Sequence, residues 1–259
     1  MLSTYTSYKL ITRDLDQSLT LKASERQVAL ESDYYLENIG KVETIDDFLD
    51  DTRLFKFAMK AFGLEEMSYA KAYMRKVLTE GISADDAFVK RLSDDRFTQF
   101  ATMFNFEGKG SSAVEGSAVR QGVVDRYVRQ SLEVSAGEEN EGVRLALYFQ
   151  RSAASVTSAY GILADEAIQE VVFTALGFPD EMKAANIDRQ AAAIEARLDI
   201  ASLQDPKEVE KLLTRFTALW DAASSTNTSP LLMLFETSSA PSVGLDLVMS
   251  LQNLKRGGY

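Results

Sequence analysis

The chain has 259 residues, with 28 Lys and Arg against 39 Asp and Glu, so its formal net charge is −11. It contains no cysteine and no histidine, which excludes disulfides, thiolate and imidazole metal sites, and catalysis by a cysteine nucleophile or a histidine base. The acidic balance, without a run of four or more basic residues, argues against nucleic acids and anionic membranes as partners.

Apolar residues at helical spacing predict amphipathic helices from the start of the chain. A first helix is expected over residues 8–19, and a second over 28–39 that ends at Gly40. A third apolar face covers residues 44–63, with a break at Asp51, because an aspartate there is placed to cap a fresh helix. The N-terminus lacks the uninterrupted apolar run of a signal peptide, so we expect none.

Two further helices are expected over residues 68–81 and 97–104, with a short capped segment between them. The stretch 107–113, EGKGSSA, holds two glycines and two serines and is the best candidate for a linker. Its GKGSS core lacks the spacing of a phosphate-binding loop, which favours the linker interpretation.

Helical patterns continue through the second part of the chain, over residues 114–134 and 143–160. Pro179 is expected to start a helix that runs to Leu198. Asp205 and Pro206 then form a strong helix start, with a capping residue and a first-turn proline in order. No alternating strand pattern of useful length and no window of ~18 uncharged apolar residues is present, so the sequence predicts an all-α protein without a membrane span.

One stretch occurs twice. DTRLFKFAMKAFGLEEM, residues 51–67, returns as DEAIQEVVFTALGFPDEM, residues 165–182, with Gly63 answered by Gly177. We therefore expect two related multi-helix halves, in which both glycines end a helix with positive φ. The expected division is an N-terminal half over residues 1–110, a C-terminal half over 111–222, and a linker and tail over 223–259. The side chains expected to be mostly buried are Phe55, Met59, Phe62, Val172, Phe173, Leu176, Phe216 and Trp220.

The densest charge cluster consists of four aspartates near the third predicted helix, Asp46, Asp47, Asp50 and Asp51. Such carboxylates could hold Ca²⁺ or Mg²⁺, or share a proton. They do not follow the glycine-containing loop pattern of a calcium site, and two of them lie near helix starts, where the helix dipole favours them. Solvated helix caps are the better interpretation, and we expect no catalytic residue, no metal and no cofactor.

The tail carries a narrow apolar stripe, formed by Leu247, Val248, Leu251 and Leu254. Because a polar linker, residues 223–229, precedes it, the stripe need not belong to the main core. Two interpretations stay open: the stripe folds back onto the body, or it docks on a partner as an amphipathic helix. These four residues are the candidate partner-binding site.

Three runs resemble a known family: residues 32–63 (SDYYLENIGKVETIDDFLDDTRLFKFAMKAFG), 74–106 (MRKVLTEGISADDAFVKRLSDDRFTQFATMFNF) and 127–151 (YVRQSLEVSAGEENEGVRLALYFQR). Together they are similar to an alphaproteobacterial family of unknown function whose members are often encoded among flagellar genes. The resemblance covers about residues 24–220. It implies an all-α fold and a link to the flagellum, and it implies no enzymatic activity.

The resulting expectation is a non-enzymatic binding or structural protein, cytoplasmic or flagellum-associated, that acts through helix–helix contacts with protein partners. Self-association is a further expectation. One alternative is a cytoplasmic, chaperone-like helper of flagellar export. Another, from a different class, is a carboxylate enzyme that uses a hard metal ion.

Overall fold

The computed structural model describes residues 2–92 and 94–226, and every regular element in that part of the chain is helical. The prediction of an all-α fold is confirmed. The chain divides into a compact unit, Met1–Leu219, and a second unit that begins at Trp220, of which only the end of the last helix is described. None of the described helices combines the length and the apolar character needed to cross a bilayer.

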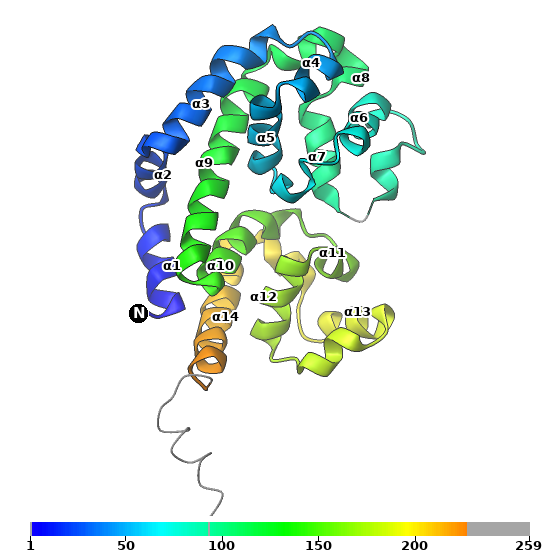
Figure 1. Ribbon diagram of the computed structural model, residues 1–259. Coiled ribbons are helices and arrows are strands. Elements are labelled where there is room, and N and C mark those ends of the chain that lie inside the picture. The colour runs from blue at the N-terminus through cyan, green and yellow to red at the C-terminus, as the bar shows by residue number, and fades with distance from the viewer. Residues whose placement is uncertain (1, 93, 227–259) are drawn as a thin grey trace, which may run out of the picture. The chain divides into compact units, whose positions relative to one another are not determined.

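The first twelve elements are eight α-helices, shown in Figure 1, and four short 3-10 helices, which are named η here. They are α1 (Thr4–Thr12), α2 (Leu15–Ser24), α3 (Arg26–Asn38), η1 (Ile39–Lys41), α4 (Ile45–Asp50), α5 (Thr52–Ala61), η2 (Glu65–Met67), α6 (Lys71–Glu80), η3 (Phe88–Arg91), α7 (Asp95–Met103), α8 (Phe106–Lys109) and η4 (Gly110–Val114). The predicted linker 107–113 is thus helical, and Ala113 and Val114 at its end are buried.

The remaining elements begin with the longest helix. They are α9 (Ser117–Glu139), α10 (Glu141–Ser152), η5 (Ala153–Ser155), α11 (Ala159–Ala164), α12 (Glu166–Leu176), η6 (Asp180–Ala184), α13 (Ile187–Glu195), η7 (Ile200–Gln204) and α14 (Pro206–Thr226). The start of α14 at Pro206 is as predicted, and the Asp205 carboxylate accepts a hydrogen bond from the Lys207 backbone N–H at 2.9 Å.

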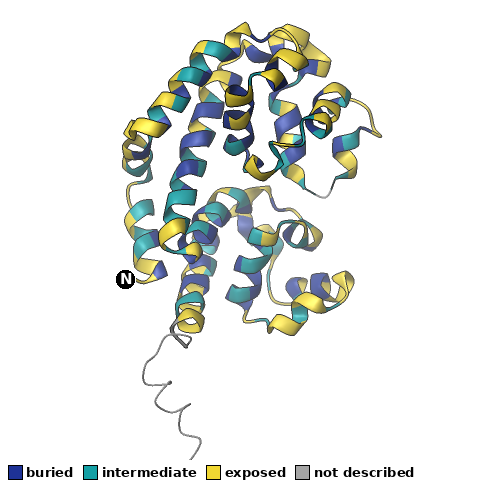
Figure 2. Ribbon diagram, viewed as in Figure 1, coloured by how far each residue is buried: buried dark blue, intermediate teal, exposed yellow. Residues whose placement is uncertain are grey.

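Helix α9 is the element against which much of the fold packs. It contacts α2, α3 and α5, which precede it in the sequence, and α10, which follows it. Phe57 of α5 stacks with both Tyr35 of α3 and Tyr127 of α9, at centroid distances of 4.6 and 3.9 Å. The Tyr35 hydroxyl also donates to the Val119 carbonyl of α9 at 2.8 Å. Buried residues recur along α3, α5 and α9, as the dark blue parts of the ribbon in Figure 2 show.

The first helix contacts α14, the last of the described helices. Tyr8 of α1 is fully buried, and its hydroxyl donates to Glu210 of α14 at 3.1 Å. The Asn140 amide, between α9 and α10, donates to Thr4 at 2.9 Å. The N-terminus is therefore tied to α10 and α14, although α2 and α3 pack on α9.

The two predicted glycine stops are confirmed. Gly63 follows α5 with φ of 69°, and Gly177 follows α12 with φ of 67°. In both cases the next residue donates its N–H to a carbonyl five positions back, from Leu64 to Met59 at 2.8 Å and from Phe178 to Phe173 at 3.0 Å. This bond pattern is the Schellman motif, which only a left-handed residue allows without strain.

Some helix boundaries differ from the prediction. The helix expected over residues 8–19 is broken, because Asp14 caps α2 by accepting from the Gln17 N–H. The helix expected from Pro179 is also broken: η6 ends at Ala184 and α13 starts three residues later. Seven of the eight predicted core side chains are buried, whereas Trp220 is only partly covered.

Candidate functional site

Three of the four clustered aspartates serve local structure. Asp46 forms an ion pair with Arg75 of α6. Asp47 completes a capping box with Thr44 at the start of α4, and those hydrogen bonds lower its pKa. Asp51 caps α5 by accepting from two backbone N–H groups. Over the residues that the structure describes, no three His, Cys, Asp or Glu side chains are grouped to hold a metal ion.

The predicted partner-binding stripe, Leu247, Val248, Leu251 and Leu254, lies outside the described residues. A small hollow of about 210 Å³ lies in the body between α12 and α14, with Leu176, Leu198 and Leu212 among its lining residues. This volume is below the roughly 300 Å³ at which ligand pockets usually begin.

The structure brings together a polar network around the end of α5. Arg96, in the first turn of α7, donates to both carboxylate oxygens of Asp94 at 2.7 to 3.0 Å. The same guanidinium donates to the Gly63 carbonyl at 2.7 Å. That carbonyl follows the last turn of α5, where a cation is favoured by the helix dipole. The bond to Asp94 is the main reason that the pKa of Arg96 is raised.

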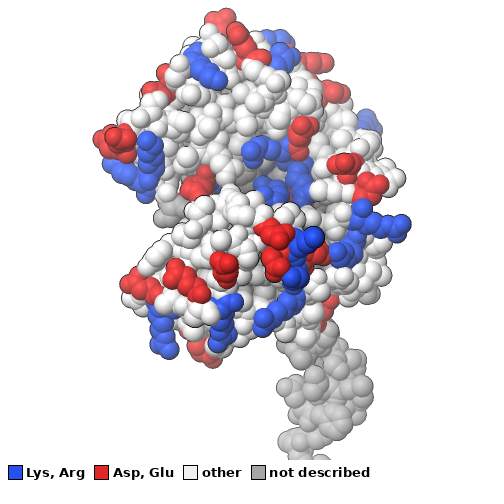
Figure 3. All heavy atoms as spheres, turned by 180° about the vertical axis from the view of Figure 1, so that it is seen from behind, with Lys and Arg blue, Asp and Glu red and all other residues white. Residues whose placement is uncertain are grey.

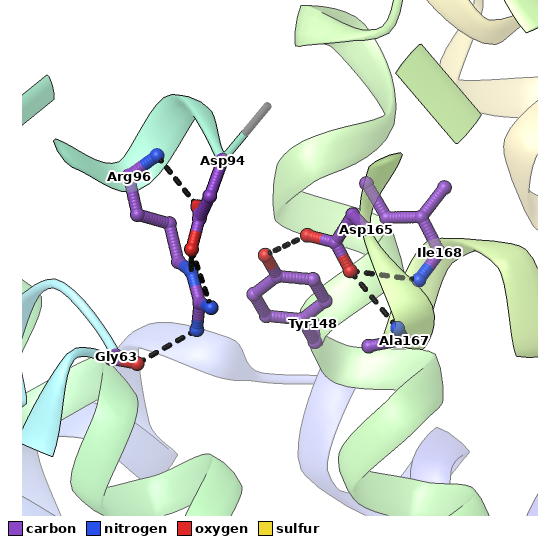
Figure 4. A network of polar contacts seen from close by, with 7 residues as sticks. All are labelled: Gly63, Asp94, Arg96, Tyr148, Asp165, Ala167 and Ile168. Atoms are coloured by element: carbon purple, nitrogen blue, oxygen red, sulfur yellow. Dashed lines mark hydrogen bonds and ion pairs between the residues drawn. The ribbon is translucent and has the colours of Figure 1, made fainter. Parts of the chain in front are cut away.

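A tyrosine–aspartate pair faces this arginine (Figure 4). The Tyr148 hydroxyl of α10 donates to Asp165 Oδ2 at 2.5 Å, while Asp165 Oδ1 caps α12 through the Ala167 and Ile168 N–H groups at 2.9 and 3.1 Å. Burial, followed by the charge of Asp165, raises the pKa of Tyr148. At neutral pH the phenol is therefore a hydrogen-bond donor and not a base.

A buried carboxylate lies behind this pair. Glu133 of α9 is 1% exposed and accepts from Arg129 at 2.9 Å and from Arg151 of α10 at 2.7 Å. Although burial opposes the charged form of Arg151, its bonds to Glu133 raise its pKa. Arg129 also donates to the Leu147 carbonyl at 3.0 Å, so the cluster joins α9 to α10.

The sequence contained a partial signal for these residues. Tyr34 donates to Asp51 at 2.9 Å with the same separation of 17 residues that joins Tyr148 to Asp165. Both copies of the repeated stretch thus begin with a capping aspartate that is bonded to a tyrosine 17 positions earlier. The contacts of Arg96 with Gly63 and of Glu133 with Arg151 have no such signal, because these residues are 33 and 18 positions apart.

Apolar side chains remain in solvent on the first three helices. Leu10 of α1 is 59% exposed, Leu21 of α2 is 63% exposed and Leu30 of α3 is 49% exposed. Exposed surface follows these helices along their outer side (Figure 2). Each of the first three helices thus exposes one leucine to solvent.

Comparison with known proteins gives a family and a structural relative. Residues 61–209 match the model of a family described as "Protein of unknown function (DUF1217)". The chain belongs to this family. A crystal structure of an Agrobacterium tumefaciens protein, from a structural genomics consortium, is 47% identical, and the match covers 85% of this chain and 96% of that chain with a TM-score of 0.79. No curated protein matches the chain.

The segment matched by DUF1217 contains most of the polar network. Arg96, Glu133, Tyr148 and Asp165 all lie inside it, as does α9. The exposed leucines of α1–α3 precede it, and residues 227–259 follow it. In this DUF1217 protein the polar network and the exposed leucines of α1–α3 are therefore on different parts of the chain.

Proposed function

We propose that this DUF1217 protein is a non-enzymatic binding or structural protein associated with the bacterial flagellum, and that it acts through helix–helix contacts with protein partners. The flagellar assignment is supported by the resemblance of residues 24–220 to a family often encoded among flagellar genes. The exposed leucines on α1–α3 carry the binding part of the proposal. Because each is about half exposed, burying the remainder would contribute ~1–2 kcal/mol of transfer free energy per leucine.

The test is a pull-down from motile cells with the full chain as bait. Leu21→Ser should reduce capture of the partner, because it removes the most exposed of the three leucines. Tyr69→Ser is the matched control, since Tyr69 is 80% exposed and lies on the segment between η2 and α6. Equal capture by both variants would rule out α1–α3 as the contact surface.

The alternative is a cytoplasmic, chaperone-like helper of flagellar export, which would use the same leucines. Fractionation separates the two functions. A structural component co-purifies with flagellar basal bodies, whereas a helper remains in the soluble cytoplasm. The metal-enzyme alternative predicts a rise in melting temperature with millimolar Ca²⁺, Mg²⁺ or Mn²⁺, and we expect no such rise.

The tail is the second proposed contact. Its stripe, Leu247, Val248, Leu251 and Leu254, has the width of a coiled-coil seam. Deletion of residues 242–259 should lower the melting temperature by no more than a few degrees and should weaken partner binding or self-association. If the deletion unfolds the protein, the stripe belongs to the core and the partner-helix proposal fails.

We further propose that the body consists of two related halves. Corresponding features of the two halves lie 114 residues apart, which supports this proposal. The pairs Tyr34–Asp51 and Tyr148–Asp165 share this offset, and so do Gly63 and Gly177. Helices α4 and α11 also start 114 residues apart, at Ile45 and Ala159. An experimental structure in which residues 26–67 and 140–182 superpose helix on helix would support the relationship, and divergent helix directions would refute it.

A further inference from the structure

Arg126 of α9 differs from the other arginines of the polar network, because its guanidinium has no anionic partner among the residues that the structure describes. Within residues 2–92 and 94–226 it makes no hydrogen bond and no ion pair, and its recorded contact is with the ring of Phe62, 5.0 Å from the guanidinium carbon to the centroid. The side chain is half-buried. Burial and the like charge of Arg151 lower its pKa.

The arginines converge on the end of α5. A Cβ built on Gly63 would lie 3.6 Å from the Arg96 guanidinium and 3.8 Å from the Gln130 amide nitrogen. Arg151 donates to Gln130 Oε1 at 2.8 Å. Gln130 therefore connects the surroundings of Arg96 to those of Arg151, and Arg126 lies over the neighbouring Phe62.

The charges of this cluster do not balance. Asp94 neutralises Arg96, while Glu133 pairs with both Arg129 and Arg151. The carboxylate of Asp165 also acts on Arg151 through its charge, so the excess is one positive charge, that of Arg126. Although the whole chain carries a net charge of −11, Lys and Arg side chains gather around the hollow in the middle of the face shown in Figure 3. A partly desolvated cation beside a like charge is unfavourable unless an anion joins it.

We propose that Arg126, with Arg151 beside it, forms an oxyanion-binding site that takes a carboxylate or phosphate group. A guanidinium presents a planar fork of N–H donors, which matches two oxygens of either group. Arg151 already donates through Nε and one terminal nitrogen to Glu133, so Arg126 provides the free donors and Arg151 the additional positive charge. The proposal concerns a site separate from the leucines of α1–α3 and does not depend on the flagellar function.

The contact with Phe62 alone predicts a different behaviour. If Arg126 served only to cover the ring, its replacement would lower the melting temperature and anions would have no specific effect. If it forms an anion site, Arg126→Gln removes the repulsion with Arg151. The variant should then melt at the same or a higher temperature than the wild type in an anion-poor buffer.

The experiment measures binding of inorganic phosphate and of acetate to the full chain, by titration calorimetry and by thermal shift, at ionic strength held constant with chloride. The wild type should bind at least one of the two and melt at a higher temperature with it. Binding of phosphate only identifies a phosphate site, and binding of acetate only identifies a carboxylate site. Arg126→Gln should weaken the binding ~10-fold or more, since it removes a charge-assisted pair of hydrogen bonds.

Two further variants complete the test. Arg126→Lys keeps the charge and loses the fork, so its affinity should fall between those of the wild type and Arg126→Gln. Arg75→Gln is the control, because Arg75 is exposed and paired with Asp46 on other helices, and it should bind as the wild type does. The proposal is overturned if neither anion binds, or if Arg126→Gln and Arg75→Gln bind as well as the wild type.

Discussion

The Tyr148 hydroxyl and the Asp165 carboxylate form a hydrogen bond of 2.5 Å that joins α10 to the start of α12. Because the other oxygen of Asp165 caps α12, both oxygens of this side chain are engaged by protein donors. The pair Tyr34–Asp51 holds the start of α5 in the same way, at 2.9 Å. At the starts of both α5 and α12, the capping aspartate is therefore also held by a tyrosine from an earlier helix.

Tyr148→Phe should lower the free energy of unfolding by ~1.5–3 kcal/mol, the usual contribution of a hydrogen bond to a charged group. The measurement is a urea unfolding curve for the variant and the wild type. Tyr160→Phe is the matched control, since Tyr160 donates to Asp188 at 2.9 Å but is 51% exposed. An equal loss of unfolding free energy in both variants would show that the Tyr148 hydrogen bond stabilises the protein no more than the exposed one of Tyr160.

Alkaline pH should destabilise the wild type more than Tyr148→Phe. Burial, and then the charge and hydrogen bond of Asp165, raise the pKa of Tyr148 above the ordinary value of about 10. Its stabilisation is therefore complete below pH ~10 and is lost as the pH rises further, because the unfolded chain releases the phenolic proton first. Melting temperatures between pH 8 and 11 test this, with Tyr69→Phe, an 80% exposed tyrosine, expected to follow the wild type.

Glu133→Gln should be among the most destabilising isosteric changes. It leaves Arg129 and Arg151 without their shared carboxylate, and breaking a buried ion pair costs ~3–5 kcal/mol. Glu141→Gln, which removes the exposed partner of Arg144, should cost ~1 kcal/mol or less. A loss for Glu133→Gln as small as that for Glu141→Gln in urea unfolding would contradict the structural role of Glu133.

Alanine should destabilise the protein at glycines with positive φ and stabilise it at a glycine inside a helix. Gly63→Ala and Gly177→Ala should each lower stability by ~1–2 kcal/mol, because a side chain at positive φ is strained although no neighbour lies within van der Waals overlap. Gly122→Ala, inside α9 with open space around it, should raise stability by ~0.5–1 kcal/mol. Thermal unfolding of the three variants tests both expectations, and a stabilising Gly63→Ala would contradict the first.

Phe62→Ala should lower the free energy of unfolding by ~3–5 kcal/mol, as expected for a core phenylalanine. Phe62 is 5% exposed and packs edge to face with Phe100 at 5.3 Å. Leu30→Ala, at a side chain that is 49% exposed, is the control and should change stability by less than ~0.5 kcal/mol. A loss below 1 kcal/mol for Phe62→Ala would place that side chain outside the core.

The features that the sequence predicted correctly are those with a local physical cause. The break at Asp51 follows from the capping of α5 by its own side chain, and the stops at Gly63 and Gly177 follow from the φ that only glycine adopts freely. The proline start of α14 is local in the same sense. Each of these signals is complete within about five residues.

The features that were missed depend on distant partners. Residues 107–113 look like a linker by composition, yet Ala113 at their end and Val114, which follows, are buried in the core. The Arg96 contact with Gly63 joins residues 33 positions apart, and the Glu133 contact with Arg151 joins residues 18 apart. Composition and periodicity contain no information on such pairs, so the charge imbalance around Arg126 is visible only in three dimensions.

The unbroken course of α9 has a mechanical consequence. At 1.5 Å per residue, its 23 residues form a rod about 34 Å long. Its two ends are clamped by different side chains, near the start by the Tyr35 bond to Val119 and near the end by the ion pairs of Glu133. A helix resists bending because its backbone hydrogen bonds run along its whole length. A displacement of α3 should therefore move α9 as a rigid body and displace α10 as well. Such stiffness would suit a part that has to keep two attachment points at a fixed spacing.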